Sequence, residues 1–103
     1  MPTVVVRYKT KPESADENQK LVENVFAELY SMGETGFSYV SLRLDDGVSF
    51  VHVVIEHDGG ATMSLTEVPS FQKFTAGIAD RCEEQPVATG AKVVGSHGWD
   101  LDT

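Results

Sequence analysis

The sequence is short of basic residues, of cysteine and of long apolar runs, and each shortage excludes a class of protein. Eight lysines and arginines stand against sixteen aspartates and glutamates, a formal net charge of −8, so the chain lacks the basic face that nucleic acids and anionic membranes require. No apolar run approaches the roughly 20 residues of a membrane-spanning helix, and the N-terminus lacks the layout of a signal peptide. Cys82 is the only cysteine, which rules out an intrachain disulfide and a thiolate zinc cluster. We therefore expect a cytoplasmic protein that binds neither nucleic acid nor membranes.

The sequence does contain a regular succession of strand and helix signals over 103 residues, the length of one domain. A β-branched run at 4–9 predicts a first strand. The capping box Ser14-Ala15-Asp16-Glu17, followed by apolar residues at helical spacing, predicts a helix that ends at Gly33.

The rest of the chain predicts a hairpin, a second helix and a last strand. These are expected at 37–44 and 47–57, from 64–69 to Cys82, and at 87–99. Asp46-Gly47 is the signal for a type I′ turn between the two hairpin strands. The order β-α-β-β-α-β predicts an α+β, ferredoxin-like fold: a four-stranded antiparallel sheet with both helices on one face. One domain is expected over 1–103, with a mobile tail at 100–103.

The expected turn also sets the register of the hairpin, because opposed residues on neighbouring strands share a face. One set, called the apolar face below, is expected under the helices: Ser38, Val40, Leu42, Val51, Val53 and Ile55. The other set, the mixed face, combines aromatic, polar and charged side chains: Phe37, Tyr39, Ser41, Arg43, Phe50, His52, Val54 and Glu56. Arg7 of the first strand is expected to join the mixed face if Val4, Val6 and Tyr8 lie under the helices.

In composition, the mixed face is neither a solvated surface nor a core. Aromatic residues beside an arginine are typical of an interface or of a ligand site. If both helices cover the apolar face, the mixed face needs a cover of its own, and a second copy in a two-fold contact is the simplest one. The sequence therefore predicts a homodimer that encloses a small-molecule cavity.

Four stretches of this chain are similar to a known family: the first strand VVVRYK, the capped first helix, DGVSFVHVVIEHDGG and PSFQKFTAGIADRC. In this order, over nearly the whole chain, they resemble the dimeric α/β-barrel superfamily, in particular its antibiotic-biosynthesis-monooxygenase (ABM)-like domains. The resemblance implies a homodimer whose two sheets form a barrel, with a small-molecule pocket in each subunit. For some relatives it also implies oxidation of phenolic polyketide intermediates by dioxygen without a bound cofactor.

Other members of this superfamily degrade haem, and the sequence departs from their pattern. They use an asparagine on the first strand, a tryptophan on the third and a histidine on the second helix. Here the first strand offers Arg7, the third strand has no tryptophan, and the second helix has no histidine. We therefore expect neither haem nor any other cofactor.

The three histidines do not predict a metal site either. His52 and His57 are five residues apart, so a regular strand sends them to opposite faces. His97 is expected on the fourth strand, two strands away from them. Cys82 is expected at the end of the second helix, as a small core residue.

His52 is the candidate general base for the implied oxidation. It would take a phenolic or enolic proton, and the carbanion-like product would react with dioxygen. Arg43 or Arg7 would stabilise the anion, and Tyr39 would orient the ring. The expected catalytic residues are thus His52 and Arg43, and the expected substrate-binding residues are Tyr39, Arg7, Phe50 and Ser41.

Two questions stay open at the level of sequence. The first is the role: the same cavity suits a non-catalytic ligand-binding or sensor module, and the chain also suits a purely structural dimerisation module. In these alternatives His52 is a hydrogen-bonded residue of the dimer seam and Arg43 an ion-pair partner. The second is the place: a pocket between sheet and helices would be lined by Tyr8, Phe71 and Phe74, and the mixed face would then be only an interface.

Overall fold

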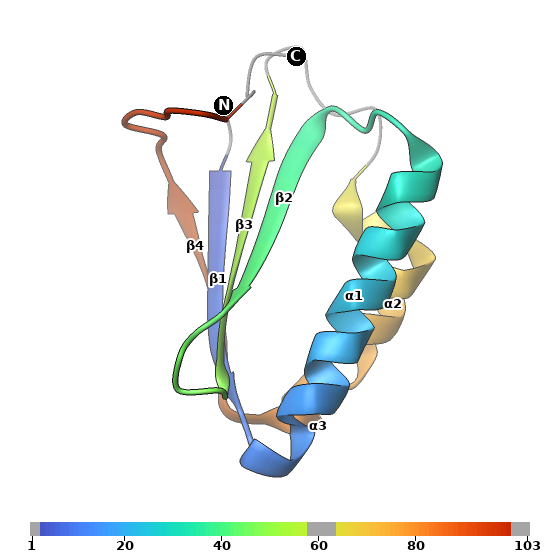
Figure 1. The fold of residues 1–103 in the computed structure, drawn as a ribbon, viewed down its shortest axis with the longest axis vertical. Coiled ribbons are helices and arrows are strands. Elements are labelled where there is room, and N and C mark those ends of the chain that lie inside the picture. Colours follow the sequence, from blue (N-terminus) through green and yellow to red (C-terminus); the bar gives the residue numbers. More distant parts are fainter. Residues whose placement is uncertain (1–2, 58–63, 100–103) are drawn as a thin grey trace.

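The computed structural model describes residues 3–57 and 64–99, which form one sheet with helices on one side (Figure 1). The elements follow in the order β1 (Thr3–Thr10), η1 (Pro12–Ser14), α1 (Ala15–Met32), β2 (Phe37–Arg43), β3 (Ser49–Glu56), η2 (Leu65–Glu67), α2 (Pro69–Ala76), α3 (Ile78–Arg81) and β4 (Cys82–Ala91). The four strands are antiparallel, in the order β2-β3-β1-β4. The predicted ferredoxin-like α+β fold is confirmed. No helix within the described residues is long and apolar enough to cross a membrane.

Helix α1 has the predicted length, but it begins differently from the prediction. Ser14 closes the 3₁₀ turn η1 in a helical backbone conformation, and its side chain makes no capping hydrogen bond. A capping box does form at Ser64 and Glu67, where it caps the N-terminus of the turn η2. At the other end Gly33, with φ of 76°, terminates α1 as predicted.

The β2–β3 hairpin has the predicted register, residue for residue, although its turn is of another type. A type I′ turn needs positive φ at both central residues, and no described non-glycine residue has positive φ. Instead, the amide of Gly47 donates to the carbonyl of Leu44 (2.9 Å), and the Asp46 carboxylate accepts from the amides of Val48 (3.0 Å) and Ser49 (2.8 Å). The Asp46 carboxylate also accepts from the Ser49 hydroxyl. This hydrogen bond and the two from the amides lower the pKa of Asp46 to about 2.

The assignment of the two faces was wrong: the helices cover the mixed face and not the apolar face, where Leu42 is exposed but Ile55 is buried. Phe50 and His52 are buried with Tyr8 of β1 under the helices, and Tyr39 stacks on Phe26 of α1 with ring centroids 4.7 Å apart. The physical reason is volume and pairing. The space between a sheet and its helices takes large aromatic side chains, and the polar atoms among them find partners there.

Arg7 is separated from the other predicted site residues by the sheet. Tyr8 and Val6 do face the helices, as expected, because Tyr8 pairs with Phe50 and Val6 with His52. The alternation along a strand then places Arg7 on the apolar face, opposite Val51 and Val87. The expectation that Arg7 joins His52 was therefore wrong.

The second helical segment is shorter than predicted and is interrupted. It breaks at Gly77, where an added Cβ would come within 3.0 Å of Nη1 of Arg81, so this glycine marks a close packing contact. Cys82 is a core residue as expected, but it begins β4 instead of ending the helix. Because β4 ends at Ala91, His97 lies beyond the strand. The predicted mobile tail at 100–103 lies outside the described residues.

Candidate functional site

A row of three hydrogen-bonded rings crosses the helix-facing side of the sheet. His52 of β3 lies in the middle. Its Nε2 is 2.8 Å from the hydroxyl of Tyr8 on β1, and its Nδ1 is 2.6 Å from the hydroxyl of Tyr39 on β2. The hydroxyl of Ser41 lies farther from Nε2, at 3.4 Å. The strand register brings these side chains together. Val6 and Ser41 pair with His52, and Tyr8 and Tyr39, two residues farther along each strand, lie on the same face.

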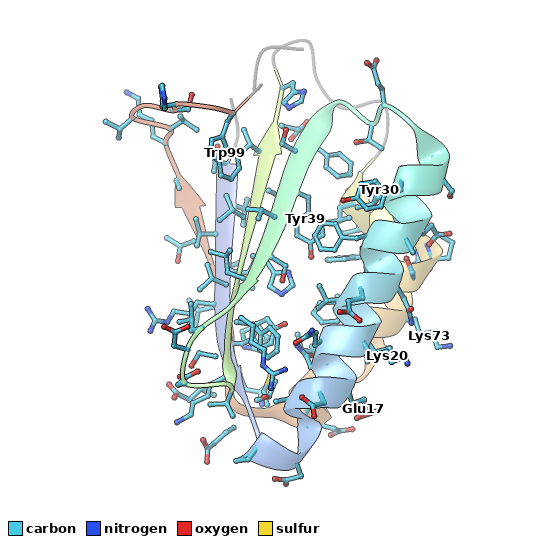
Figure 2. All side chains as sticks on the ribbon, viewed as in Figure 1. Glu17, Lys20, Tyr30, Tyr39, Lys73 and Trp99 are labelled. Carbon is cyan, nitrogen blue, oxygen red and sulfur yellow. The ribbon has the colours of Figure 1, made fainter. Side chains whose placement is uncertain are left out.

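The row continues into the helices through two residues that the sequence analysis did not identify. Nδ2 of Asn18 on α1 donates to the hydroxyl of Tyr8 (2.8 Å), and Nε of Arg81 on α3 donates to Oδ1 of Asn18 (3.1 Å). We call Arg81, Asn18, Tyr8, His52 and Tyr39 the buried polar chain. Its first four members are each less than one tenth exposed. Figure 2 shows the last one, Tyr39, reaching from β2 toward the helices.

Arg81 is a buried cation without an acidic partner among residues 3–57 and 64–99. Its charge is compensated by neutral groups instead. Nη2 donates to the carbonyl of Phe74 (2.7 Å), and the guanidinium carbon lies 5.3 Å from the centroid of the Phe74 ring. The inner end of the buried polar chain therefore carries a fixed positive charge.

Burial determines the protonation states of the rings. Desolvation lowers the pKa of His52 to about 4 and raises the pKa of both Tyr8 and Tyr39. At neutral pH the imidazole is uncharged and both phenols keep their protons. The chain thus consists of neutral rings that a charged residue terminates on the helix side.

Aromatic neighbours hold these rings in place. Phe50 stacks on Tyr8 with ring centroids 5.4 Å apart, and Phe74 stacks on His52 at 5.5 Å. Because hydrogen bonds fix the ring edges and stacking fixes the ring faces, little freedom of orientation remains.

A cavity of about 290 Å³ lies between α1 and the β2–β3 hairpin and is called the α1 cavity; Tyr39 stacks on Phe26, one of its lining residues. It is lined by Gln19, Val22, Glu23, Phe26, Ser41, Arg43 and Phe50. Arg43 contributes to its wall with Nη1 bound to Asp16 (3.1 Å) and Gln19 (2.7 Å), and its guanidinium carbon is 5.7 Å from the Phe50 ring. The aromatic walls, the Arg43 cation and the Ser41 hydroxyl suit a small aromatic molecule with an oxygen substituent, and Glu23 adds one carboxylate to the wall.

A second cavity, of about 490 Å³, lies at the η2 end of the same face and is called the η2 cavity. Apolar side chains form most of its wall: Val4, Val6, Phe37, Val54, Leu65 and Phe71. Glu56 and Glu67 are its acidic groups. Ser64 and Thr66 add hydroxyls to its wall, but it has no cation there, so it offers less to an anionic oxygen than the α1 cavity does.

The structure brings together most of the residues predicted for the site, on the side of the sheet that the sequence argument did not favour. Ser41, Arg43 and Phe50 line the α1 cavity, and the other two residues contact its lining: His52 lies 3.4 Å from the Ser41 hydroxyl, and Tyr39 stacks on Phe26. This is the alternative placement between sheet and helices. Of the residues expected to line such a pocket, Phe71 lines the η2 cavity, and Tyr8 and Phe74 belong to the ring layer behind the α1 cavity.

The sequence could have indicated that Asn18 is buried and hydrogen-bonded, but it contains no comparable indication for Arg81. Asn18 lies on the buried stripe of α1 with Ala15, Val22 and Val25, and an amide at helical spacing among apolar residues indicates a buried hydrogen-bonding group. Arg81 lies at a helix end, where an arginine is usually exposed.

Within the described part of the chain, no group of three or more histidine, cysteine, aspartate or glutamate side chains is arranged to hold a metal ion. His52 and His57 lie on opposite faces of the sheet, as predicted, and Nε2 of His57 is 2.6 Å from the Ser38 hydroxyl.

No family model matches the chain, and no curated protein matches it in sequence. Solved structures do match. An antibiotic biosynthesis monooxygenase aligns with a TM-score of 0.73 at 16% identity over 92% of this chain and 100% of its own. SnoaB from Streptomyces nogalater, described as a cofactor-independent oxygenase, aligns with a TM-score of 0.64 at 14% identity over 95% and 97%. A protein of unknown function from Nitrosomonas europaea aligns with a TM-score of 0.68 at 12% identity over 93% and 91%. The chain therefore has the ABM fold.

Proposed function

We propose that this protein is a homodimeric, small-molecule-binding enzyme that oxidises an aromatic or polyketide-like phenol or enol with dioxygen and without a cofactor. The observation that carries the proposal is the α1 cavity, whose aromatic walls, cation and hydroxyl lie against the buried polar chain. Support also comes from the fold, which is shared with a protein described as a cofactor-independent oxygenase.

In this proposal Phe26 and Phe50 hold the ring of the ligand, and Ser41 and Tyr39 contact its oxygen atoms. Arg43 promotes ionisation of the ligand by exchanging Asp16 for the ligand anion. Asp16 is 96% exposed, so its carboxylate returns to water at little cost. The lost proton passes to solvent at the mouth of the cavity.

The oxidation then needs only dioxygen as co-reactant. The ionised carbon bonds to one oxygen atom of dioxygen, and the peroxide formed takes up a proton. Its O–O bond breaks as the remaining hydrogen leaves that carbon, so one oxygen atom stays as a carbonyl and the other departs as water. His52 has both ring nitrogens engaged by Tyr8 and Tyr39, so we assign it the task of holding Tyr39.

Oxygen uptake with a panel of phenols and naphthols tests this proposal. Arg43→Gln should lower kcat/KM about 10- to 100-fold, the range expected when a charge-assisted hydrogen bond is lost. Lys20→Gln makes the same charge change on an exposed position of α1 and should leave the rate unchanged. Equal activity of Arg43→Gln and wild type would contradict the role of Arg43, and full activity in His52→Ala would remove His52 from the mechanism, as base or as support.

A ligand-binding module without turnover is the second candidate. It is favoured by the hydrogen bonds that Arg43 and His52 make to other protein groups, which leave His52 without a free ring nitrogen to act as a base. This candidate predicts saturable binding of the same phenols with no oxygen uptake. A purely structural dimerisation module predicts neither binding nor turnover.

The homodimer is proposed from the open apolar face. Leu42 and Val87 are 48% and 63% exposed there, beside Val40, Val51 and Val53. Arg7 lies between Val51 and Val87 on this face, and exposed apolar side chains around a single arginine are typical of a protein–protein contact. We propose that a second copy covers it in a two-fold contact, so that the two sheets form the walls of a barrel.

A further inference from the structure

We propose that Asn18 and Arg81 are positioning residues that fix the direction of every hydrogen bond through His52, so that Tyr39 ends the chain as a donor to an acceptor oxygen of the ligand. The direction of the bonds stands on the geometry alone. The ligand part rests on the function proposed above, and the two parts are tested separately below.

The direction is set at the inner end of the chain by Arg81. A guanidinium has only donors, so the atom of Asn18 that faces Nε of Arg81 must be the amide oxygen. The amide nitrogen of Asn18 then faces Tyr8, and it can only donate to the Tyr8 hydroxyl oxygen. The orientation of this buried amide is therefore determined by a charged partner.

Tyr8 transmits the direction to His52. Its hydroxyl oxygen accepts from Asn18, and its single proton is left for its other partner, Nε2 of His52. In the reverse arrangement Nε2 would carry the proton, and Tyr8 would face two donors with its own proton buried and unpaired. Burying a donor without an acceptor is unfavourable, so Nε2 is the acceptor.

His52 passes the same direction to Tyr39. A neutral imidazole with a lone pair at Nε2 carries its proton at Nδ1. The Nδ1–H then donates to the Tyr39 hydroxyl oxygen, 2.6 Å away. The proton of Tyr39 itself has no acceptor within the part of the chain that the structure describes, while its ring lies against Phe26 in the wall of the α1 cavity.

The consequence is a preference for one class of ligand. Tyr39 can donate to a carbonyl, enolate or phenolate oxygen but offers little to an ammonium group. Because each bond points the same way from a buried cation, the bonds polarise one another and strengthen the terminal donor. A donor aimed at an enolate oxygen stabilises the charge that develops there.

The direction is tested by the protonation of His52 in a long-range ¹H–¹⁵N correlation spectrum of ¹⁵N-labelled protein at about pH 7. We expect a protonated, pyrrole-type Nδ1 and a pyridine-type Nε2 in the wild type. Asn18→Asp puts a second acceptor in place of the amide donor, so Tyr8 donates to the carboxylate and the His52 proton moves to Nε2. The matched control, Asn24→Asp at an exposed position of α1, should leave the spectrum of His52 unchanged.

Two results would overturn the direction: a wild-type His52 protonated at Nε2, or an Asn18→Asp variant that keeps its proton at Nδ1. The first result needs no variant, so the inference is decided even if Asn18→Asp does not fold. Tyr39→Phe should leave Nδ1 protonated, because the direction comes from Tyr8; a proton shift to Nε2 there would show that Tyr39 sets the tautomer instead.

The ligand part is tested with 1-tetralone and with the matched amine, 1-aminotetralin. We expect the ketone to bind more tightly, and Tyr39→Phe to weaken its binding about 3- to 10-fold, as loss of one hydrogen bond does. Tighter binding of the amine, or equal ketone affinity in Tyr39→Phe, would overturn the ligand role of Tyr39. If neither compound binds while His52 has the expected tautomer, the proposed function fails and the direction of the chain stands.

Discussion

His52 owes its neutral state to its surroundings. The ring lies between two phenols and against Phe74, and no carboxylate of the described residues forms an ion pair with it. A histidine of this kind connects neutral donors and acceptors and does not carry a charge at neutral pH. We therefore expect His52 to support Tyr39, and we expect its removal to lower the stability of the protein.

The stability of the protein should depend on pH through His52. Burial lowers its pKa to about 4, from 6.5 in the unfolded chain, so the unfolded chain binds more protons between these pH values. The contribution of neutral His52 to the free energy of unfolding is complete above about pH 6.5 and is lost as the pH falls toward 4. We expect a decrease of about 3 kcal/mol in the free energy of unfolding across this window, measured by urea titration.

Two variants isolate this effect. His52→Gln should flatten the dependence between about pH 6.5 and about pH 4, whereas His97→Gln, at an exposed position, should retain it. The same pH slope in His52→Gln and in the wild type would show that His52 is not the titrating group.

At the scale of elements, the hairpin shows what a sequence pattern can and cannot decide. The spacing about Asp46-Gly47 was enough to predict the register of β2 against β3, because one residue of slippage exchanges the two faces. The pattern did not tell which face meets the helices. That choice depends on partners from distant segments: Tyr8, which hydrogen-bonds His52, and Asn18 of α1, which hydrogen-bonds Tyr8.

The same limit explains which parts of the candidate site were predicted. Tyr39, Ser41, Arg43, Phe50 and His52 came together because the hairpin register alone makes them neighbours. Asn18 and Arg81 reach the site through the packing of α1 and α3, which no local pattern encodes. Arg7 was misplaced because the mixed face of the hairpin lies on the same side as Val6 and Tyr8. The alternation along β1 then sends Arg7 to the opposite side of the sheet.

The end of α1 provides a test of backbone conformation. Gly33 has φ of 76° and ψ of −143°, a region that residues with a Cβ rarely adopt, although an added Cβ would meet no atom within 4 Å. Gly33→Ala should therefore lower the free energy of unfolding by about 1–3 kcal/mol through strain alone. Gly90→Ala, where the space is also open but φ is not positive, should change it by less than about 1 kcal/mol. Equal effects in chemical denaturation would contradict this explanation.

At the scale of the whole molecule, the two proposals concern opposite faces of the sheet. The α1 cavity, the η2 cavity and the buried polar chain lie on the helix-facing side, and Leu42 and Val87 are exposed on the other side. We therefore expect that the proposed assembly and the proposed ligand binding can be changed separately by mutation.

Assembly is tested at the centre of the apolar face. Val53→Lys places a charge there and should convert a dimer into a monomer in sedimentation velocity at micromolar concentration, because an unpaired charge is unfavourable in an apolar contact. Glu17→Lys introduces the same side chain at an exposed position of α1 and should leave the dimer intact. A monomeric wild type would rule out the proposed barrel.

The central claim is that a small aromatic molecule binds between α1 and the sheet, beside Tyr39. The most direct measurement is a titration of ¹⁵N-labelled protein with 2-naphthol, followed by the backbone amide resonances. We expect saturable shifts concentrated at Phe26, Ser41 and Arg43. Shifts concentrated at Val53 and Val87 would place the ligand on the apolar face instead, and that result would contradict the account.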